Sequence, residues 1–291
     1  MLGSGDTGRG DVVFTAMCTF IVAALTGSAA LLGLVGCDPD HGDTTAPTAR
    51  TSAPVSAPPE VTEALRAAHT ATDRAGSARV DAVLRIGDRM STTTRGTLGW
   101  SDGLSGTLTI GYTGGSMART MRELGSARTE ARFVADVYYA RMSDKFAALA
   151  QGRHWVKYRY DASTNFAPNQ SVALLLAAGD ARKVGRETVR GVSTTHYTGT
   201  VRVADLPTEG PDAAGSADLR KQLQDAGVTS QRVDVWIDAR NLLVKRVERS
   251  GTASGAMDTT AHYSDFGAPV KAGKAPPAED TVDYQDLLDQ S

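Results

Sequence analysis

The nine residues ARVDAVLRI, Ala78–Ile86, decide the fold class that this chain is expected to adopt. Every second residue in the stretch is small or apolar, and three of the four residues between them are charged. A period of two residues is that of a β-strand with one face buried and the other facing water. The stretch therefore predicts a strand at the start of a sheet.

Similar stretches follow along the chain, separated by turn residues such as Ser101-Asp102-Gly103 and Gly114-Gly115. The further predicted strands are 92–100, 104–112, 119–124, 127–134, 137–142, 155–160, 183–203, 231–237, 242–250 and 257–266, with a tail after the last. Open sheets of about ten strands usually curl. The expected fold class is therefore α+β, with a large curled antiparallel sheet, a half-barrel of about ten strands, wrapped over a few helices.

Four helices are predicted. The first, Glu60–Ala75, places Val61, Leu65, Ala68 and Thr72 on one face. A short helix is expected at 144–150, and a polar one at 213–226. The helix at 171–178 is almost wholly apolar, with Ser171 and Gly179 as candidate caps. Because a helix this apolar must be buried, we expect it to cover the concave face of the sheet.

An apolar run, Val12–Val35, precedes the domain and ends in Leu34-Val35-Gly36-Cys37. This ending resembles the lipobox of bacterial lipoproteins, which implies cleavage before Cys37 and a diacylglycerol on its thiol. Residues 1–36 are thus expected to be a signal peptide. The only basic residue before the run is Arg9, and the run approaches the length that spans a bilayer. An uncleaved membrane anchor and a mis-assigned start codon therefore stay open as alternatives.

The remaining chain divides into a tether, 37–59, and a soluble domain, 60–291. The tether is dominated by Pro, Thr, Ser and Ala, a composition that cannot bury enough apolar surface to order itself. The only other cysteine, Cys18, lies in the leader, so the mature chain can form no internal disulfide or thiolate metal site. The net charge of -2 argues against a nucleic-acid partner.

The succession of helix, long meander and apolar helix, followed by Gly185–Tyr197 and Val233–Val247, resembles actinobacterial lipoproteins of the LppX and LprG type. These are related in fold to the lipoprotein carrier LolA. The resemblance covers Glu60 to about Phe266. It implies a half-barrel wrapped over helices that encloses an apolar cavity, in which several relatives carry acylated lipids or lipoproteins. The location expected from the lipobox is the outer face of the cytoplasmic membrane.

A lipid cavity and a dry packed core are both compatible with the apolar pattern. Small residues on the strands, such as Gly96 and Gly106, are expected to leave room for a cavity. The candidate lining residues are Leu84, Leu98, Trp100, Leu108, Phe133, Tyr139, Trp155, Leu174, Leu175 and Leu176. The alternative function is an envelope scaffold or a sensor module without a cavity.

No motif for catalysis or for cofactor binding occurs in the sequence, so neither enzyme activity nor a cofactor is expected. His69, His154, His196 and His262 lack metal-ligand spacing and are interpreted as surface or locally bonded residues. Asp234 and Asp238 are interpreted as turn residues at a strand end rather than as an acid–base pair.

Overall fold

The computed structural model describes residues 57–135, 137–158, 167–206, 217, 220–221, 223–224, 227–252, 254–271 and 273–289. The predicted signal peptide and lipidation site, nearly all of the tether and most of the polar helix at 213–226 lie outside these residues.

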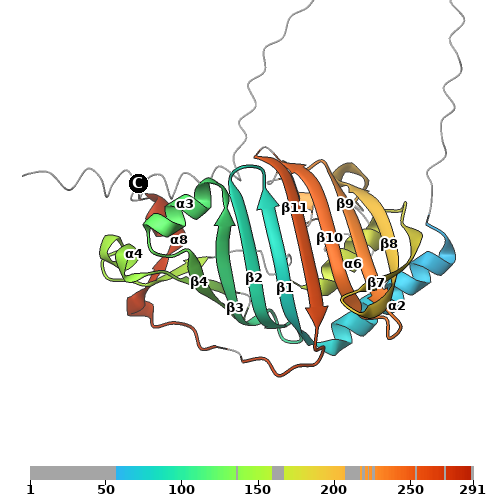
Figure 1. Cartoon of the computed structure of the whole chain (residues 1–291), viewed down its shortest axis with the longest axis horizontal. Helices are drawn as coiled ribbons and strands as arrows, with labels where there is room; N and C mark the ends of the chain where they lie inside the picture. The colour runs from blue at the N-terminus through green and yellow to red at the C-terminus, as the bar shows by residue number, and fades with distance from the viewer. Residues whose placement is uncertain are drawn as a thin grey trace, which may run out of the picture.

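One curled, open sheet of twelve strands dominates the described part of the chain (Figure 1). In chain order the strands are β1 (Ser77–Ile86), β2 (Met90–Gly99), β3 (Ser105–Gly114), β4 (Arg128–Val134), β5 (Val137–Arg141), β6 (Trp155–Tyr158), β7 (Arg182–Val189), β8 (Val192–Arg202), β9 (Ser230–Asp238), β10 (Leu243–Thr252), β11 (Gly255–Ser264) and β12 (Thr281–Asp283). Their order across the sheet is β12-β6-β5-β4-β3-β2-β1-β11-β10-β9-β8-β7. The predicted fold class is therefore confirmed, with twelve strands in place of about ten.

The sheet consists of two meanders that meet at one seam. Neighbouring strands within the meanders β1–β6 and β7–β11 are consecutive in the chain, and β12 is added at the edge beside β6. The seam is the pair β1 and β11, from Arg79 opposite Ser264 to Ile86 opposite Met257. All pairs are antiparallel except β12 with β6, which are parallel. The predicted alternation of Ala78–Ile86 thus belongs to a central strand with a partner on each side.

Helix α2 (Pro59–Ala75) confirms the first predicted helix. It begins with Pro59, whose missing N–H costs nothing at the first helical position. Its buried residues are the predicted stripe Val61, Leu65, Ala68 and Thr72. It ends at Gly76, which adopts a left-handed conformation with φ of 67°.

Helix α6 (Pro168–Ala177) is the predicted apolar helix, and it packs against α2 and against β8, β9 and β10 (Figure 1). Its predicted N-cap was wrong, because the helix starts at Pro168 and Ser171 lies inside it, fully buried. Gly179 follows the helix with φ of 72°, in keeping with its predicted place at the end. We call the face of the sheet that carries α6 the inner face, and the opposite one the outer face.

The prediction of a strand at 119–124 was wrong. The segment belongs to helix α3 (Gly115–Glu123), whose buried side chains include Met117 and Met121. With Leu124, which is also buried, these residues recur at spacings of four and three, the period of a helix face. The strand prediction began at Arg119 and so left out Met117, the residue that makes this period visible.

The far end of the sheet has its own core, made by α3, α4 (Asp144–Leu149) and α8 (Tyr284–Asp289). Helix α4 confirms the predicted short helix, with Ser143 as its N-cap. The strand β12 and helix α8 lie in the segment interpreted as a tail, and they bury Val282 and Leu287 there. This second core consists of Met117, Met121, Leu124, Met142, Phe146, Ala150, Val156, Val282 and Leu287.

Candidate functional site

The main core lies on the inner face beneath α2 and α6, and seven of the ten residues predicted to line a cavity belong to it or pack against it. The fully buried members are Leu98, Leu108, Phe133, Leu174 and Leu175, while Trp100 and Leu176 are partly buried against the same core. The Trp100 indole N–H lies 3.2 Å from two carbonyl oxygens of α2, those of Thr72 and Asp73. These contacts make this part of the inner face a packed core.

One small strand residue is matched by a large side chain of α6. A β-carbon on Gly199 of β8 would lie 2.7 Å from Leu175 Cδ1, so the leucine occupies the space above that glycine. At Gly96 and Gly106 a β-carbon would collide with the backbone carbonyl of the neighbouring strand. These two glycines permit close approach of neighbouring strands, and the expectation that they leave room for a cavity stays a prediction.

Tyr139 and Trp155 point away from the predicted cavity. In the register of β4 and β5, inner-face Phe133 pairs with Tyr138, so Tyr139 lies on the outer face. Trp155 pairs with Arg141 and shares that outer face, where the Arg132 guanidinium lies 4.4 Å from its ring centroid. These two aromatic residues therefore cannot line a site together with Phe133.

The remaining candidate, Leu84, belongs to a different part of the inner face. It is half-buried, as are four other inner-face side chains of β1, β2, β3 and β5. We call this set the central strip, which consists of Leu84, Ile86, Met90, Tyr112 and Tyr138. Tyr112 packs partly against the main core and partly against the second core, so the strip lies between the two.

Tyrosine rings cluster at this strip. Rings of Phe133, Tyr138, Tyr158 and Tyr284 form a chain with successive centroids 5.2, 5.1 and 5.1 Å apart. Burial raises the pKa of Tyr138 well above its usual value, and Tyr112 and Tyr158 raise it further. Burial also raises the pKa of Tyr112. The strip thus combines apolar side chains with neutral hydroxyl groups at any physiological pH.

A buried polar trio fastens α6 to the inner face. Arg246 Nη1 lies 3.0 Å from Glu248 Oε1 and donates to Ser171 Oγ at 2.7 Å. The Ser171 hydroxyl in turn donates to Glu248 at 2.5 Å. Because both charges are buried, the pair needs these bonds to offset its desolvation.

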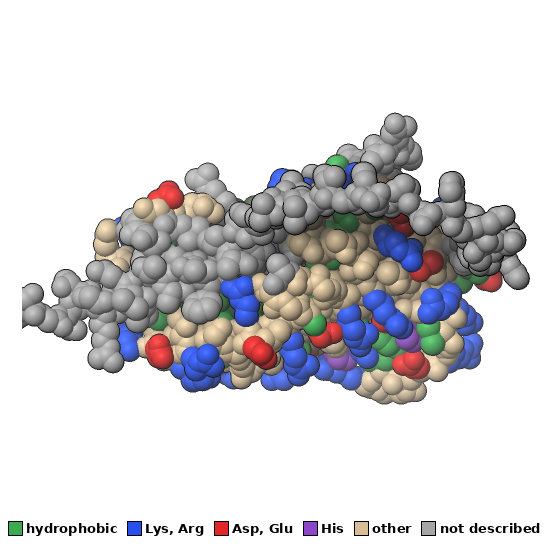
Figure 2. Space-filling view, turned by 90° about the horizontal axis from the view of Figure 1, so that it is seen from above, with side chains coloured by type: hydrophobic (Ala, Val, Ile, Leu, Met, Phe, Trp, Pro, Cys, Tyr) green, Lys and Arg blue, Asp and Glu red, His purple; other side chains and the backbone are tan. Residues whose placement is uncertain are grey.

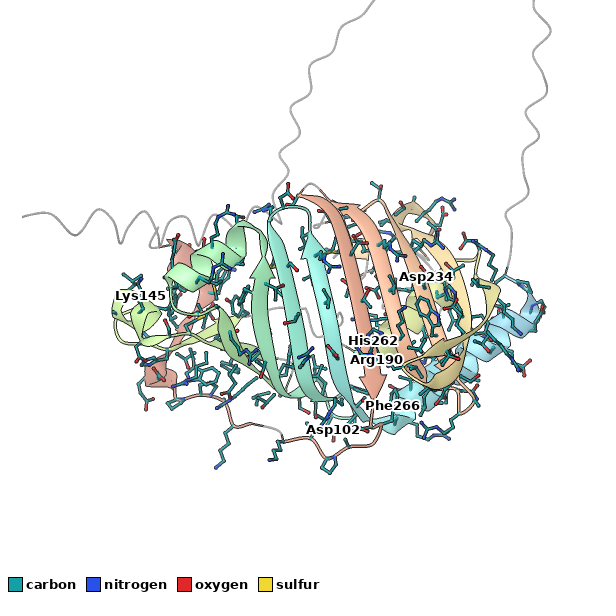
Figure 3. The ribbon with its side chains drawn as sticks, viewed as in Figure 1. Asp102, Lys145, Arg190, Asp234, His262 and Phe266 are labelled. Atoms are coloured by element: carbon teal, nitrogen blue, oxygen red, sulfur yellow. The ribbon has the colours of Figure 1, made fainter. Side chains whose placement is uncertain are left out.

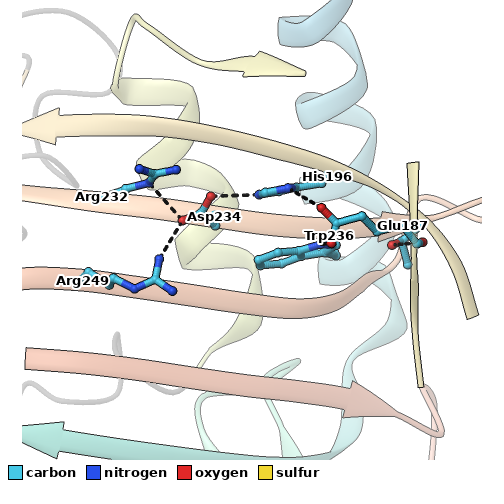
Figure 4. A network of polar contacts seen from close by, with 7 residues as sticks. Glu187, His196, Arg232, Asp234, Trp236 and Arg249 are labelled. Carbon is cyan, nitrogen blue, oxygen red and sulfur yellow. Dashed lines mark hydrogen bonds and ion pairs between the residues drawn. The ribbon is translucent and has the colours of Figure 1, made fainter. Parts of the chain in front are cut away.

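A polar network covers the outer face of β7–β10 (Figure 4). His196 lies between two carboxylates, with Nδ1 2.9 Å from Glu187 Oε1 and Nε2 2.8 Å from Asp234 Oδ1. Trp236 stacks on His196 at a centroid distance of 4.2 Å and donates to Glu187 Oε2 at 2.8 Å. Lys245 Nζ lies 3.9 Å from the Trp236 ring centroid. The strand register places Lys245, Trp236 and His196 side by side, because Trp236 pairs with both of the others.

Asp234 is the buried member of the network, with a side chain 3% exposed. Arg232 Nε and Arg249 Nη1 each lie 3.3 Å from its Oδ2 atom. Desolvation opposes ionisation of this carboxyl, but the hydrogen bonds from His196 and Thr198 and the nearby arginine lower its pKa. The interpretation of Asp234 as a turn residue was wrong. Asp238 does lie at the turn, where it accepts from the N–H groups of Arg240 and Leu242.

His196 is locally bonded, as expected, but sequence reasoning gave no sign of its partners. His154 is also locally bonded, with Nδ1 2.8 Å from Asp280. Among the described residues no group of three or more His, Cys, Asp or Glu side chains could hold a metal ion. In that same part of the chain, every helix is too short or too polar to span a bilayer.

Comparisons with known proteins found two curated relatives. A Streptomyces coelicolor protein, SCO4650, whose name describes it as a candidate lipoprotein, is 43% identical over 309 aligned positions that cover 98% of each chain. A 31.2 kDa protein of Streptomyces griseus from the rplA–rplJ intergenic region is 43% identical over 245 positions, 78% of this chain and 80% of that one.

Among solved structures, the Mycobacterium tuberculosis lipoprotein LppX is 16% identical with a TM-score of 0.49, over 74% of this chain and 99% of that chain. No protein-family model matches the sequence.

Proposed function

Because this chain belongs to the family of actinobacterial lipoproteins that includes the Streptomyces coelicolor relative, we propose that it is a membrane-anchored lipid-binding protein. In this proposal Cys37 carries the diacylglycerol, and the tether 38–59 links it to the domain. The domain lies on the extracytoplasmic side of the cytoplasmic membrane. The ligand is a lipid or another apolar molecule, and it is held without bond-making chemistry.

The central strip is the observation that carries the ligand part of the proposal. Its side chains are only partly buried on the inner face of a curled sheet, whereas the residues of the two cores on either side of it are fully buried. An acyl chain laid on Leu84, Ile86 and Met90 gains about 0.8 kcal/mol for each CH₂ group removed from water. The hydroxyls of Tyr112 and Tyr138 are suited to donate to an ester or carboxyl oxygen of the same molecule.

The binding site therefore differs from the one expected beneath α6. Leu174 and Leu175 are buried against the sheet and belong to the main core. Of the predicted lining residues, we retain Leu84 as a direct ligand contact. Phe133 contributes through Tyr138, on which its ring packs.

The experiment measures lipid that is bound without a covalent link. The full chain is expressed in an actinobacterial host and purified in mild detergent, and non-covalent lipids are extracted and quantified by mass spectrometry. We expect about one apolar molecule per wild-type chain and a loss of at least fivefold in Leu84→Arg. The matched control is Val83→Arg, which changes the adjacent half-buried residue on the outer face.

Wild-type protein without bound apolar molecules, or equal loss in Leu84→Arg and Val83→Arg, would contradict the proposal. The first result would favour an envelope scaffold or sensor module, in which the central strip contacts another protein.

Anchoring is tested separately with Cys37→Ser. The variant is expected to accumulate as an unprocessed precursor that incorporates no labelled fatty acid, because the thiol that receives the lipid is gone. Metabolic labelling and the electrophoretic mobility of the chain measure this. Normal processing of Cys37→Ser would rule out lipidation at this residue and leave the uncleaved anchor.

A further inference from the structure

A groove of about 570 Å³ lies on the outer face, where the β7–β8 turn reaches over β1, β2 and β11. Its charged lining comes from Arg79, Asp81, Arg95, Arg190 and His262. Figure 3 shows Arg190 and His262 next to each other at this place, in front of the sheet. The groove is on the opposite face from the central strip and has no part in the proposed lipid site.

The hairpin turn holds Arg190 in place. Arg190 and Gly191 both have positive φ, 48° and 85°, as in the tight two-residue turns that match the twist of a hairpin. Beside the turn, Val189 is buried with Trp236, Val244 and Val247 on the outer face. The β7–β8 turn is thereby packed onto the sheet, and the Arg190 side chain extends from this turn to Asp81 of β1.

Asp81 holds two guanidinium groups together. Arg190 Nη2 lies 3.0 Å from Asp81 Oδ2, and Arg95 Nε lies 3.4 Å from Asp81 Oδ1. Their side chains remain 55% and 73% exposed, so most of their donor nitrogens face solvent. Arg79 adds a third guanidinium to the lining, and its Nε lies 3.7 Å from Oδ2 of Asp265, which is outside the lining.

The surroundings of the groove are basic as well. Figure 2 shows Lys and Arg side chains gathered along the outer face with His among them. Desolvation lowers the pKa of His262, and the positive charges of Arg190 and Lys245 lower it further. The same positive potential that disfavours the charged imidazole favours an anion in the groove.

From this arrangement we propose that the groove binds a phosphate group, either as the free ion or in a lipid headgroup. Guanidinium groups form paired hydrogen bonds to phosphate oxygens, and several of them together match an anion with more than two acceptor oxygens. Val189, Val192 and Val244 line the same groove and can contact the apolar part of a headgroup. Asp81 acts as a positioning residue, because it holds Arg95 and Arg190 side by side without touching the anion.

Binding is measured by calorimetry on the full chain in non-ionic detergent, with two probes, inorganic phosphate and dihexanoyl-phosphatidylglycerol. We expect the double variant Arg95→Gln/Arg190→Gln to bind at least tenfold more weakly than wild type. The matched control, Arg85→Gln/Arg128→Gln, removes two exposed arginines from the same outer face but outside the groove, and should bind like wild type.

The two probes distinguish a site for the free phosphate ion from a site for a lipid headgroup. Binding of inorganic phosphate identifies a site for the free ion, and binding of the phosphatidylglycerol alone identifies a headgroup site; both results support the groove. Binding of neither probe, or equal losses in the groove and control variants, overturns the proposal.

For Asp81, Asp81→Asn should weaken binding although it makes the groove more positive, and Asp81→Glu should restore most of it. Stronger binding by Asp81→Asn would refute the positioning role. Lipid extraction from the same variants keeps this test apart from that of the central strip, since the groove variants should retain their apolar ligand.

Discussion

Asp234 shows how one carboxylate organises a network on the surface of a sheet. It faces His196 on the neighbouring strand β8, Arg249 on the other neighbour, β10, and Arg232 on its own strand. Because its side chain is almost fully buried, these donors must replace the water that it lost. Removing its charge leaves several donors without an acceptor.

We predict that Asp234→Asn lowers the free energy of unfolding by about 1–3 kcal/mol at neutral pH. The folded-state pKa of Asp234 is below its usual 3.8, so its contribution is complete above the unfolded value and disappears as the pH falls through the folded one. The difference between wild type and variant should therefore shrink below about pH 4. Urea unfolding at several pH values, followed by tryptophan fluorescence, measures it.

Asp258→Asn is the control, since Asp258 pairs with the same Arg249 but is 47% exposed. A surface pair of this kind contributes little, so this variant should differ from wild type by less than about 0.5 kcal/mol. Equal effects of the two substitutions would show that burial of Asp234 is not what matters.

Sequence reasoning at this scale could assign faces but not partners. The alternation that made Ala78–Ile86 a strand also separates Tyr138 from Tyr139, yet which of them faces the helices depends on the register with Phe133. His196 and Asp234 are 38 positions apart and share no sequence pattern, because their contact arises only from the pairing of β8 with β9. For that reason the polar network on the outer face could not be predicted, and neither could the residues of the central strip other than Leu84.

At the scale of elements, the shortest segments were predicted least well. Most strands and the helices α2, α4 and α6 lie where their periods place them. Helix α3 was interpreted as a strand because six residues are too few to separate the two periods. The strand β12 has three residues, fewer than any pattern requires, and its parallel pairing with β6 gives no local signal.

The C-terminal helix α8 is nevertheless expected to be required for the second core. Leu287 is 2% exposed and packs in that core, so Leu287→Ala should lower the free energy of unfolding by about 2–5 kcal/mol. Gln285→Ala, at an exposed position of the same helix, should change it little. Denaturant unfolding of both variants measures this, and an unaffected Leu287→Ala would mean that α8 contributes nothing to the core.

At the scale of the whole molecule, the curled sheet has an inner face that is covered unevenly. The sequence predicted a curled sheet and an apolar helix on its concave side, and both are present. It also led to the expectation that the ligand lies under that helix, whereas α6 closes the half of the inner face formed by β8–β10. The position of the partly buried central strip between the two cores is visible only in the three-dimensional arrangement.

The seam between β1 and β11 determines when this molecule can finish folding. A chain that emerges from its N-terminus completes β1 long before Gly255–Ser264 becomes available, so one edge of β1 has no strand beside it during that interval. Exposed strand edges are templates for aggregation, and pairings between distant segments form slowly. A chain interrupted before β11 would therefore carry two half-sheets with open edges, and its solubility is decided by the last strands to emerge.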